Sequence, residues 1–168
     1  MRTRSVVGTT LALATLAACA TQAPAPPRAP DAAAIRAALE KEMAKFGPLF
    51  AAKDAAGVAA LFTSDATWVL PDASTFVGAE AIRAGAKGFF DSLESFTIES
   101  EGIDRLIVVN DSEVVTFAHG IGTMKAKGAK KAERNINPFA DHWKKGADGA
   151  WRIAYEVNAF GPVPAKKP

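Results

Sequence analysis

The chain has 168 residues, of which 49% are hydrophobic and 8% aromatic, and this suits one compact domain with a sizeable core and short appendages. Twenty Lys and Arg residues oppose eighteen Asp and Glu residues, and two of the basic ones, Arg2 and Arg4, lie in a segment that we expect to be removed. The rest of the chain is then neutral, which argues against nucleic acid as a partner. Because Cys19 is the single cysteine, an intrachain disulfide is excluded.

Residues 1–18 have the layout of a secretory signal peptide. Two arginines precede an apolar stretch, 6–18, which is shorter than the ~20 apolar residues that a membrane-spanning helix needs. The sequence Leu16-Ala17-Ala18-Cys19 resembles the lipobox of bacterial lipoproteins, which implies that Cys19 is lipidated. Ala20 after the cysteine implies, by the same resemblance, a location in the cell envelope on the periplasmic face of the outer membrane. The alternative is an ordinary signal peptide with a chance cysteine.

A proline-rich spacer follows the lipidated cysteine. Residues 21–30 contain four prolines and almost no bulky apolar side chain, so they cannot pack a core. We expect an extended linker over 19–30, at about 3 Å per residue. The domain is expected to span 31–162, followed by a flexible tail at 163–168.

Three helices are predicted at the start of the domain. Asp31 is a plausible N-cap for a long helix, which Gly47-Pro48 should interrupt because Pro48 cannot donate to the carbonyl of Ala44. Asp54 can cap a second, short helix that ends near Phe62. A third helix is expected from Gly78 to Leu93, with Ile82 and Phe90 on its buried side.

The remaining segments read as strands and turns. Ser64-Asp65 is a predicted turn before a strand over 66–70, and a short return strand follows at 75–77. The later strands are expected at 96–109, 113–125, 133–144 and 150–160. The basic cluster from Lys125 to Arg134 is predicted to be a solvated hairpin tip.

The segment from Phe139 to Phe160 predicts a β-hairpin that turns at Gly146-Ala147-Asp148-Gly149. After the turn the residues alternate with a period of two, so we expect two distinct faces. The apolar face would hold Trp151, Ile153, Tyr155 and Val157, and the mixed face Arg152, Ala154, Glu156 and Asn158.

Helices followed by a run of strands predict an α+β fold. We expect a cone-like, curved, mainly antiparallel (mixed) sheet packed against about three N-terminal helices. The open end of such a cone would form a pocket, which is the default position for a ligand site.

Four motifs occur in order along the domain: Asp54-Ala-Ala-Gly-Val-Ala-Ala-Leu-Phe62, Ser64-Asp65-Ala66-Thr67, Gly78-Ala79-Glu80-Ala81-Ile82 and Asp148-Gly149-Ala150-Trp151-Arg152-Ile153. Together they resemble the SnoaL-like, ketosteroid-isomerase-like branch of the nuclear-transport-factor-2-like superfamily. The resemblance covers Ala33 to Pro162 and implies the fold of that superfamily. It implies no single activity, because its members include isomerases, cyclases, dehydratases and dimerisation modules.

Comparison with the steroid isomerases of this fold bears on catalysis. By resemblance, their general-base Asp corresponds to Leu70, and their oxyanion-hole Tyr falls near Phe46. Neither side chain can exchange a proton. Their third group, a protonated carboxylic acid, corresponds to Asp141. The resemblance therefore favours a binding module over a steroid isomerase, and leaves open whether the protein is an enzyme.

Asp141 is the first candidate for chemistry. It alternates with Asn135, Asn137, Phe139 and Trp143, so these five residues are expected to share one strand face. On the concave face, burial would raise the pKa of Asp141 and allow it to act as an acid or base. The alternative is an edge carboxylate paired with Lys144 or Lys145.

Glu156, Asn158 and Phe160 are the next candidates, as ligand contacts on the last strand. Alternatively, Glu156 and Asn158 make structural hydrogen bonds to a loop or to a dimer partner. His119 is a third acid–base candidate, although a lone His on the apolar face of Val115, Phe117 and Ile121 is more often a core or interface residue. Phe46, Trp68 and Phe139 could line the pocket or simply fill the core. No metal-binding spacing of His, and no motif for a cofactor, is present in the sequence.

Three functions fit these observations. The favoured one is a lipid-anchored envelope protein whose pocket binds a small, largely apolar molecule. The second is an isomerase, lyase or hydrolase that uses Asp141, Glu156 or His119. The third is an interaction module, expected to be a homodimer through Trp151, Ile153, Tyr155 and Val157.

Overall fold

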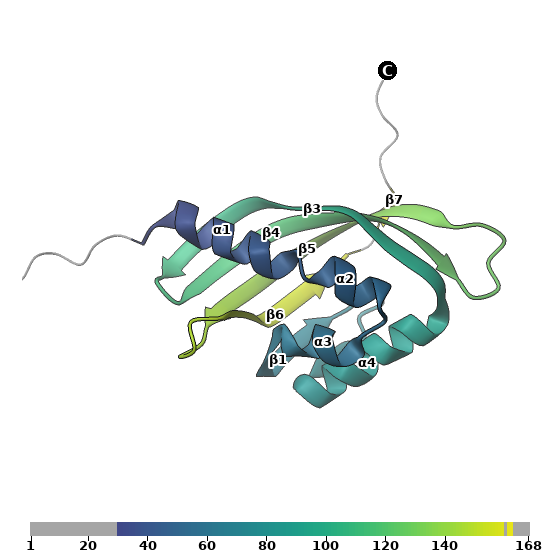
Figure 1. Cartoon of the computed structure of the whole chain (residues 1–168), viewed down its shortest axis with the longest axis horizontal. Helices are drawn as coiled ribbons and strands as arrows, with labels where there is room; N and C mark the ends of the chain where they lie inside the picture. The colour runs from purple at the N-terminus through teal and green to yellow at the C-terminus, as the bar shows by residue number, and fades with distance from the viewer. Residues whose placement is uncertain (1–29, 160, 163–168) are drawn as a thin grey trace, which may run out of the picture.

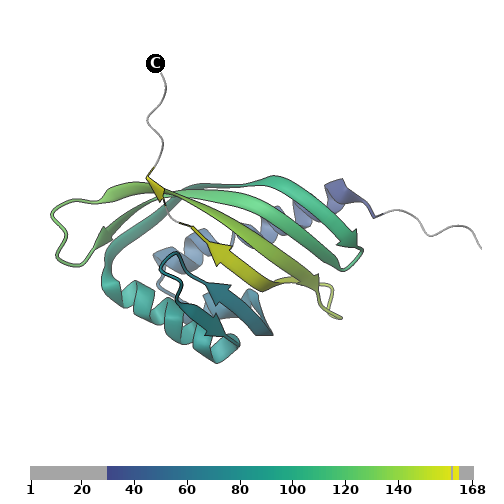
Figure 2. The same ribbon diagram turned by 180° about the vertical axis from the view of Figure 1, so that it is seen from behind.

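Four helices cover one face of a curved, seven-stranded mixed sheet in the computed structural model, which describes residues 30–159, 161 and 162. Figures 1 and 2, seen from opposite sides, show that the helices lie on one side of the sheet and leave the other side uncovered. The predicted signal peptide, Cys19, the linker, Phe160 and the tail lie outside the described residues.

The helices begin where the predicted caps place them. Asp31 accepts hydrogen bonds from the amides of Ala33 and Ala34 at the start of α1 (Ala32–Met43), and Asp54 accepts one from Gly57 in α3 (Ala55–Ala60). The other two helices are α2 (Phe46–Ala51) and α4 (Ala79–Ser92).

The interruption of the first helix lies two to three residues earlier than predicted. The chain leaves the helix at Ala44 and Lys45, so Pro48 falls within the first turn of α2. There its missing amide proton costs no helical hydrogen bond. Proline was therefore a sound signal for a break, but the break comes before it.

The strands are β1 (Phe62–Val69), β2 (Thr75–Val77), β3 (Leu93–Asn110), β4 (Glu113–Ala126), β5 (Glu133–Lys145), β6 (Trp151–Asn158) and β7 (Gly161–Pro162). They pair in the order β2-β1-β6-β5-β4-β3, and β7 pairs with β5. Only the β1–β6 pairing among the described strands is parallel. The predicted turn at Ser64-Asp65 is wrong: both residues lie inside β1, where the register with β6 shifts between Phe62 and Thr67.

A β-bulge in β6 changes which side chains face the helices. Trp143 pairs with Ile153 and His142 pairs with Tyr155, so Ala154 is an extra residue with no partner on β5. Trp151 and Ile153 are buried before the bulge, whereas Tyr155 is 44% exposed after it. The prediction that these residues form one apolar face is therefore wrong.

Strand β3 contains four similar shifts, of which the two in the middle of the strand set the direction of its side chains near the cavity. Its register with β4 changes between Ile98 and Ser100 and again between Ile103 and Arg105. Before the first of these shifts, the side chains directed at the helices are Phe96 and Ile98. Between the two they are Glu101 and Ile103, and after the second they are Leu106 and Val108. Each shift moves the inward set by one residue.

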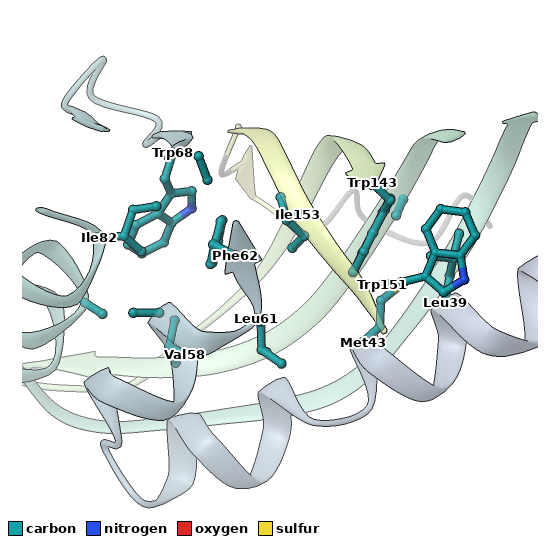
Figure 3. Packing of buried hydrophobic residues seen from close by; sticks show 14 of the residues in the cluster. Leu39, Met43, Val58, Leu61, Phe62, Trp68, Ile82, Trp143, Trp151 and Ile153 are labelled. Carbon is teal, nitrogen blue, oxygen red and sulfur yellow. The ribbon is translucent and has the colours of Figure 1, made fainter. Parts of the chain in front are cut away.

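The core fills the space between the helices and the concave side of the sheet. Leu39 and Met43 of α1 pack near Trp143 and Trp151 at one end, as Figure 3 shows. A second group, near α3 and α4, contains Val58, Leu61, Phe62, Trp68 and Ile82.

Of the residues that the structure describes, none belongs to a helix long and apolar enough to cross a membrane. Residues 126–134 are exposed at the β4–β5 hairpin tip, which confirms the predicted solvated basic cluster.

Candidate functional site

A cavity of about 110 Å³ lies between α1, α2 and α4 and the concave side of the sheet. Most of its wall is apolar, and we use the term aromatic wall for Phe46, Phe50, Trp68, Phe89, Phe96 and Phe139. The polar end consists of Glu101, Asn137, Asp141 and Glu156, which all line the cavity.

Phe50 is the centre of one side of the aromatic wall. Its ring centroid lies 5.2 Å from those of Phe90 and Phe96 and 6.0 Å from those of Phe46 and Phe89. The break before α2 turns Phe46 and Phe50 toward the sheet together. The contacts with Phe89 and Phe90 are edge-to-face and the other two are tilted, and together they make a firm apolar surface.

Asp141, at the polar end, is only 1% exposed. Its Oδ2 accepts a hydrogen bond of 3.2 Å from Oγ1 of Thr116, and that hydroxyl accepts one of 3.0 Å from Nε1 of Trp143. Within the described part of the chain, Oδ1 of Asp141 has no hydrogen-bond partner. Burial, with the negative charge of Glu156 beside it, raises the pKa of Asp141 well above its ordinary value.

The alternative role for Asp141, a surface ion pair with lysine, does not match this geometry. Lys144 lies 3.9 Å from Glu113, and the ammonium of Lys145 lies 5.9 Å from the centre of the Trp151 ring. Neither lysine lines the cavity.

Glu156 lies directly opposite Asp141 on the neighbouring strand. Its Oε1 accepts hydrogen bonds from Nε1 of Trp68, at 2.8 Å, and from the amide of Asn158. Burial raises the pKa of Glu156, and the two hydrogen bonds oppose that rise because they stabilise the carboxylate. The bulge at Ala154 is what directs Glu156 inward, toward Asp141.

Two asparagines continue the hydrogen bonds of the polar end. Nδ2 of Asn137 donates to Oδ1 of Asn158 at 2.8 Å, and Nδ2 of Asn158 donates to the carbonyl of Val69 at 3.4 Å as well as to Glu156. Asn158 does not line the cavity itself. It forms hydrogen bonds with two residues that do, Asn137 and Glu156, and so holds them in place.

Glu101 is a member of the polar end that the sequence did not predict. Burial and the charge of Glu156 raise its pKa to about 7. Strict alternation from Phe96 and Ile98 would direct Glu101 outward, and only the shift in register turns it in. A signal was present, because the apolar positions of this strand change from even to odd at Ile103 and back at Leu106.

His119 lies apart from the cavity. Its Nδ1 is 2.9 Å from the carboxylate of Asp104 on the outer face of the sheet, and it does not line the cavity. The buried residues of β4 are Val114, Thr116 and Ala118, so the face that carries His119 is the exposed one.

The predicted site residues thus divide into three groups. Phe46, Trp68, Phe139, Asp141 and Glu156 come together around the cavity; Asn158 supports them from behind; Phe160 lies outside the described residues. Leu70 also lines the cavity, where a carboxylate would be needed for the steroid-isomerase base. Among residues 30–159, 161 and 162, no group of three or more His, Cys, Asp or Glu is placed to hold a metal ion.

The arrangement allows two kinds of chemistry. A ligand in the cavity can exchange hydrogen bonds with Asp141 and Glu101. Alternatively, carboxyl groups whose pKa values are raised toward neutrality can take up or release a proton next to an apolar molecule.

Solved structures with the same fold have little sequence in common with this chain. A ketosteroid isomerase-like protein from Erwinia carotovora atroseptica has a TM-score of 0.66 at 16% identity, covering 76% of this chain and 97% of its own. A hexachlorocyclohexane dehydrochlorinase, LinA-type3 from Novosphingobium barchaimii, has a TM-score of 0.66 at 16% identity, covering 78% and 91%.

An NTF2-like protein with a cystatin-like fold, from Novosphingobium aromaticivorans, has a TM-score of 0.62 at 18% identity, covering 77% of this chain and 84% of its own. No curated protein sequence matches the chain. The SnoaL-like domain family matches residues 43–154, two thirds of the sequence. The chain therefore belongs to the SnoaL-like domain family, and its fold is NTF2-like.

Proposed function

We propose that the protein binds a small, largely apolar molecule in the cavity, with the polar part of that molecule at Asp141 and Glu156. The observation that carries this proposal is an aromatic wall that ends at a buried carboxyl oxygen, Oδ1 of Asp141, which has no partner among the residues that the structure describes. A buried polar atom left without a hydrogen bond costs about 1–3 kcal/mol. A ligand that supplies the missing bond removes that cost.

The size of the cavity limits the ligand. Dry apolar cavities of roughly 150 Å³ in proteins hold benzene. A cavity of about 110 Å³ therefore suits a single ring or the end of a longer molecule that continues through the opening.

Native mass spectrometry of the gently purified full-length protein tests the proposal. We expect a reproducible extra mass that leaves on denaturation. Gly120→Leu should abolish it: Gly120 lines the cavity and a Cβ there meets only ordinary contacts, so the added side chain occupies the cavity without displacing the backbone. Phe117→Leu, on the outer face, is the control. Retention of the mass by Gly120→Leu would contradict binding in this cavity.

An enzyme is the second candidate, favoured by the pairing of Asp141 and Glu156 across neighbouring strands. Two carboxyl groups with raised pKa values can share one proton and pass it to a bound molecule. Two neighbours of the same fold are named as a ketosteroid isomerase-like protein and a hexachlorocyclohexane dehydrochlorinase, which supports an enzyme of isomerase or lyase type. Incorporation of solvent deuterium into the bound molecule, lost in Asp141→Asn, would establish it; a ligand that leaves unlabelled would exclude it.

We also propose that Cys19 is lipidated and anchors the protein in the cell envelope, at the periplasmic face of the outer membrane. The lipobox-like Leu16-Ala17-Ala18-Cys19 supports this. A Cys19→Ser variant should appear in the soluble fraction, and wild-type Cys19 should carry acyl mass.

Homodimerisation is proposed through the outer face of the sheet. Tyr155, Phe117 and Ile107 are 44%, 45% and 39% exposed there. Tyr155 pairs with His142, His142 with Val115 and Val115 with Ile107. These four residues therefore form one row across strands β6, β5, β4 and β3. This surface replaces the predicted one, since Trp151 and Ile153 are buried in the core.

A further inference from the structure

We infer that the molecule held in the cavity carries a protonated amine on its apolar frame. This inference rests on the proposed binding function and adds the chemical class of the ligand.

With its carboxyl groups ionised, the polar end has only acceptors as unused hydrogen-bonding capacity. Two buried side-chain atoms of the described residues lack a partner, Oδ1 of Asp141 and Oδ1 of Asn137, and both belong to residues that line the cavity. The nearby donors are engaged: the indole N–H of Trp68 with Glu156, that of Trp143 with Thr116, and the hydroxyl of Thr116 with Asp141. The amide of Asn135, which also lines the cavity, donates to the carbonyl of Glu133. A donating ligand therefore completes this end when Asp141 is ionised, whereas a protonated Asp141 would itself donate to an accepting ligand.

The orientation of the Asn137 amide follows from a main-chain atom. The carbonyl of Val69 can only accept, so it fixes Nδ2 of Asn158 on its own side and leaves Oδ1 of Asn158 toward Asn137. Asn137 must then present its Nδ2 to Asn158. Its Oδ1 is left as a buried acceptor whether or not Glu156 is ionised.

Charge selects an ammonium group among possible donors. Three carboxyl groups line the cavity, Glu101 from β3, Asp141 from β5 and Glu156 from β6. Within the described structure no Lys, Arg or His side chain lines it, and α2 and β1 contribute only apolar side chains and Trp68. An ammonium supplies three donors and a compensating charge, and the ring faces of Trp68 and Trp143 favour a cation further. An alcohol supplies only one donor, and a carboxylate on the ligand would be repelled by the ionised carboxyl groups of the cavity.

Proton release distinguishes an ammonium from a neutral ligand. A cation beside Glu101 and Asp141 favours their charged forms, so binding at neutral pH should expel protons. Amine affinity should therefore rise between pH 5 and pH 8, whereas the affinity of a neutral analogue should change little.

The test compares three probes with one frame: 4-phenylbutylamine, 4-phenylbutanol and 4-phenylbutyrate. Binding to the full-length protein is followed by NMR through the indole N–H signals of Trp68 and Trp143, both of which line the cavity. Calorimetry in buffers of different ionisation enthalpy measures the protons released. At pH 8 we expect the amine to bind roughly tenfold tighter than the alcohol, the effect of hydrogen bonds to charged groups.

Two variants form a matched pair on strand β3. Glu101→Gln removes one carboxyl from the cavity and should reduce both the preference for the amine and the proton release. Glu99→Gln makes the same change two residues away, where the side chain pairs with Arg134 and Thr123 outside the cavity, and should alter neither. Asp141→Asn provides a second cavity variant should Glu101→Gln fold poorly.

The outcomes separate the two proposals. Equal or tighter binding of the alcohol, or an amine preference that both Glu101→Gln and Asp141→Asn retain, overturns the amine inference and leaves apolar binding in place. If none of the three probes shifts the indole signals, the proposed binding function fails and the inference with it.

Discussion

Thr116 is the residue on which the geometry at Asp141 depends. Its hydroxyl joins Trp143 and Asp141, and all three side chains are buried. Replacement of Thr116 by Val keeps the shape of the side chain but leaves the indole N–H and a carboxyl oxygen without partners.

We expect Thr116→Val to lower the free energy of unfolding by about 2–4 kcal/mol, since each unsatisfied buried group costs about 1–3 kcal/mol. Urea denaturation measures it. Thr123→Val on the same strand removes a more accessible hydrogen bond, to Glu99, and should change stability by less than about 0.5 kcal/mol. Equal effects of the two variants would show that the hydrogen bonds at Asp141 carry no special weight.

The raised pKa of Glu101 leads to a prediction of how the stability of the fold depends on pH. Its pKa is raised from 4.5 to about 7 by burial and by Glu156, so between these values the folded protein holds a proton that the unfolded chain has lost. The free energy of unfolding therefore falls as pH rises through this interval. The raised pKa values of Asp141 and Glu156 act in the same direction.

The measurement is the melting temperature of the ligand-free protein from pH 4.5 to pH 8. We expect a steady decrease in the wild type, a shallower one in Glu101→Gln, and the wild-type slope in Glu99→Gln. A melting temperature that rises across this range would contradict the raised pKa values.

For single residues, the sequence correctly predicted which side chains share a face wherever the strand is regular. The alternation along β5 correctly brings Asn137, Phe139, Asp141 and Trp143 to one face, because β5 has no shift in register between these residues and β4. The face on which Glu101 lies could not be predicted from alternation. Its direction depends on an extra residue, Glu99, whose effect appears only when β3 and β4 are paired.

At the scale of elements, the bulge in β6 determines which residues line the cavity. Deletion of Ala154 would restore strict alternation, so that Trp151 and Ile153 could no longer face inward together with Glu156 and Asn158. One of the two sets would have to face the solvent.

We expect the Ala154 deletion to abolish ligand binding and to destabilise the protein by more than about 4 kcal/mol, the range of buried networks and large core residues. Deletion of Ala129, an exposed residue of the β4–β5 tip, is the control and should be tolerated. Circular dichroism and native mass spectrometry report both effects. A folded, ligand-binding Ala154 deletion would mean that the bulge can move along the strand.

The sequence predicted the starts of helices well, and it predicted the irregularities of strands poorly. The caps at Asp31 and Asp54 follow from side-chain oxygens that accept nearby amides, and such bonds are visible in sequence. The strand character of Ser64 and Asp65 was missed, because both are typical turn residues and their pairing with β6 is imposed by the sheet.

At the scale of the molecule, the uncovered face of the sheet should control association. We expect Tyr155→Lys and Phe117→Glu to convert a dimer into a monomer, since each adds charge to the middle of the proposed interface. Light scattering measures the mass. Val77→Lys, at an exposed position on β2, is the control and should leave the mass unchanged. A wild-type protein that is strictly monomeric would contradict the proposed dimer.

The hydrogen bond from Asn158 to Val69 has a consequence for how this domain can diversify. Substitutions in the aromatic wall can reshape the space available to a ligand one residue at a time. The demand for a donating group depends on fewer positions, because the carbonyl of Val69, which no substitution removes, orients Asn158 and through it Asn137. Over evolutionary time, ligand shape should drift readily in descendants of this protein, while a preference for donors should persist until Asn137, Asp141 or Asn158 is replaced.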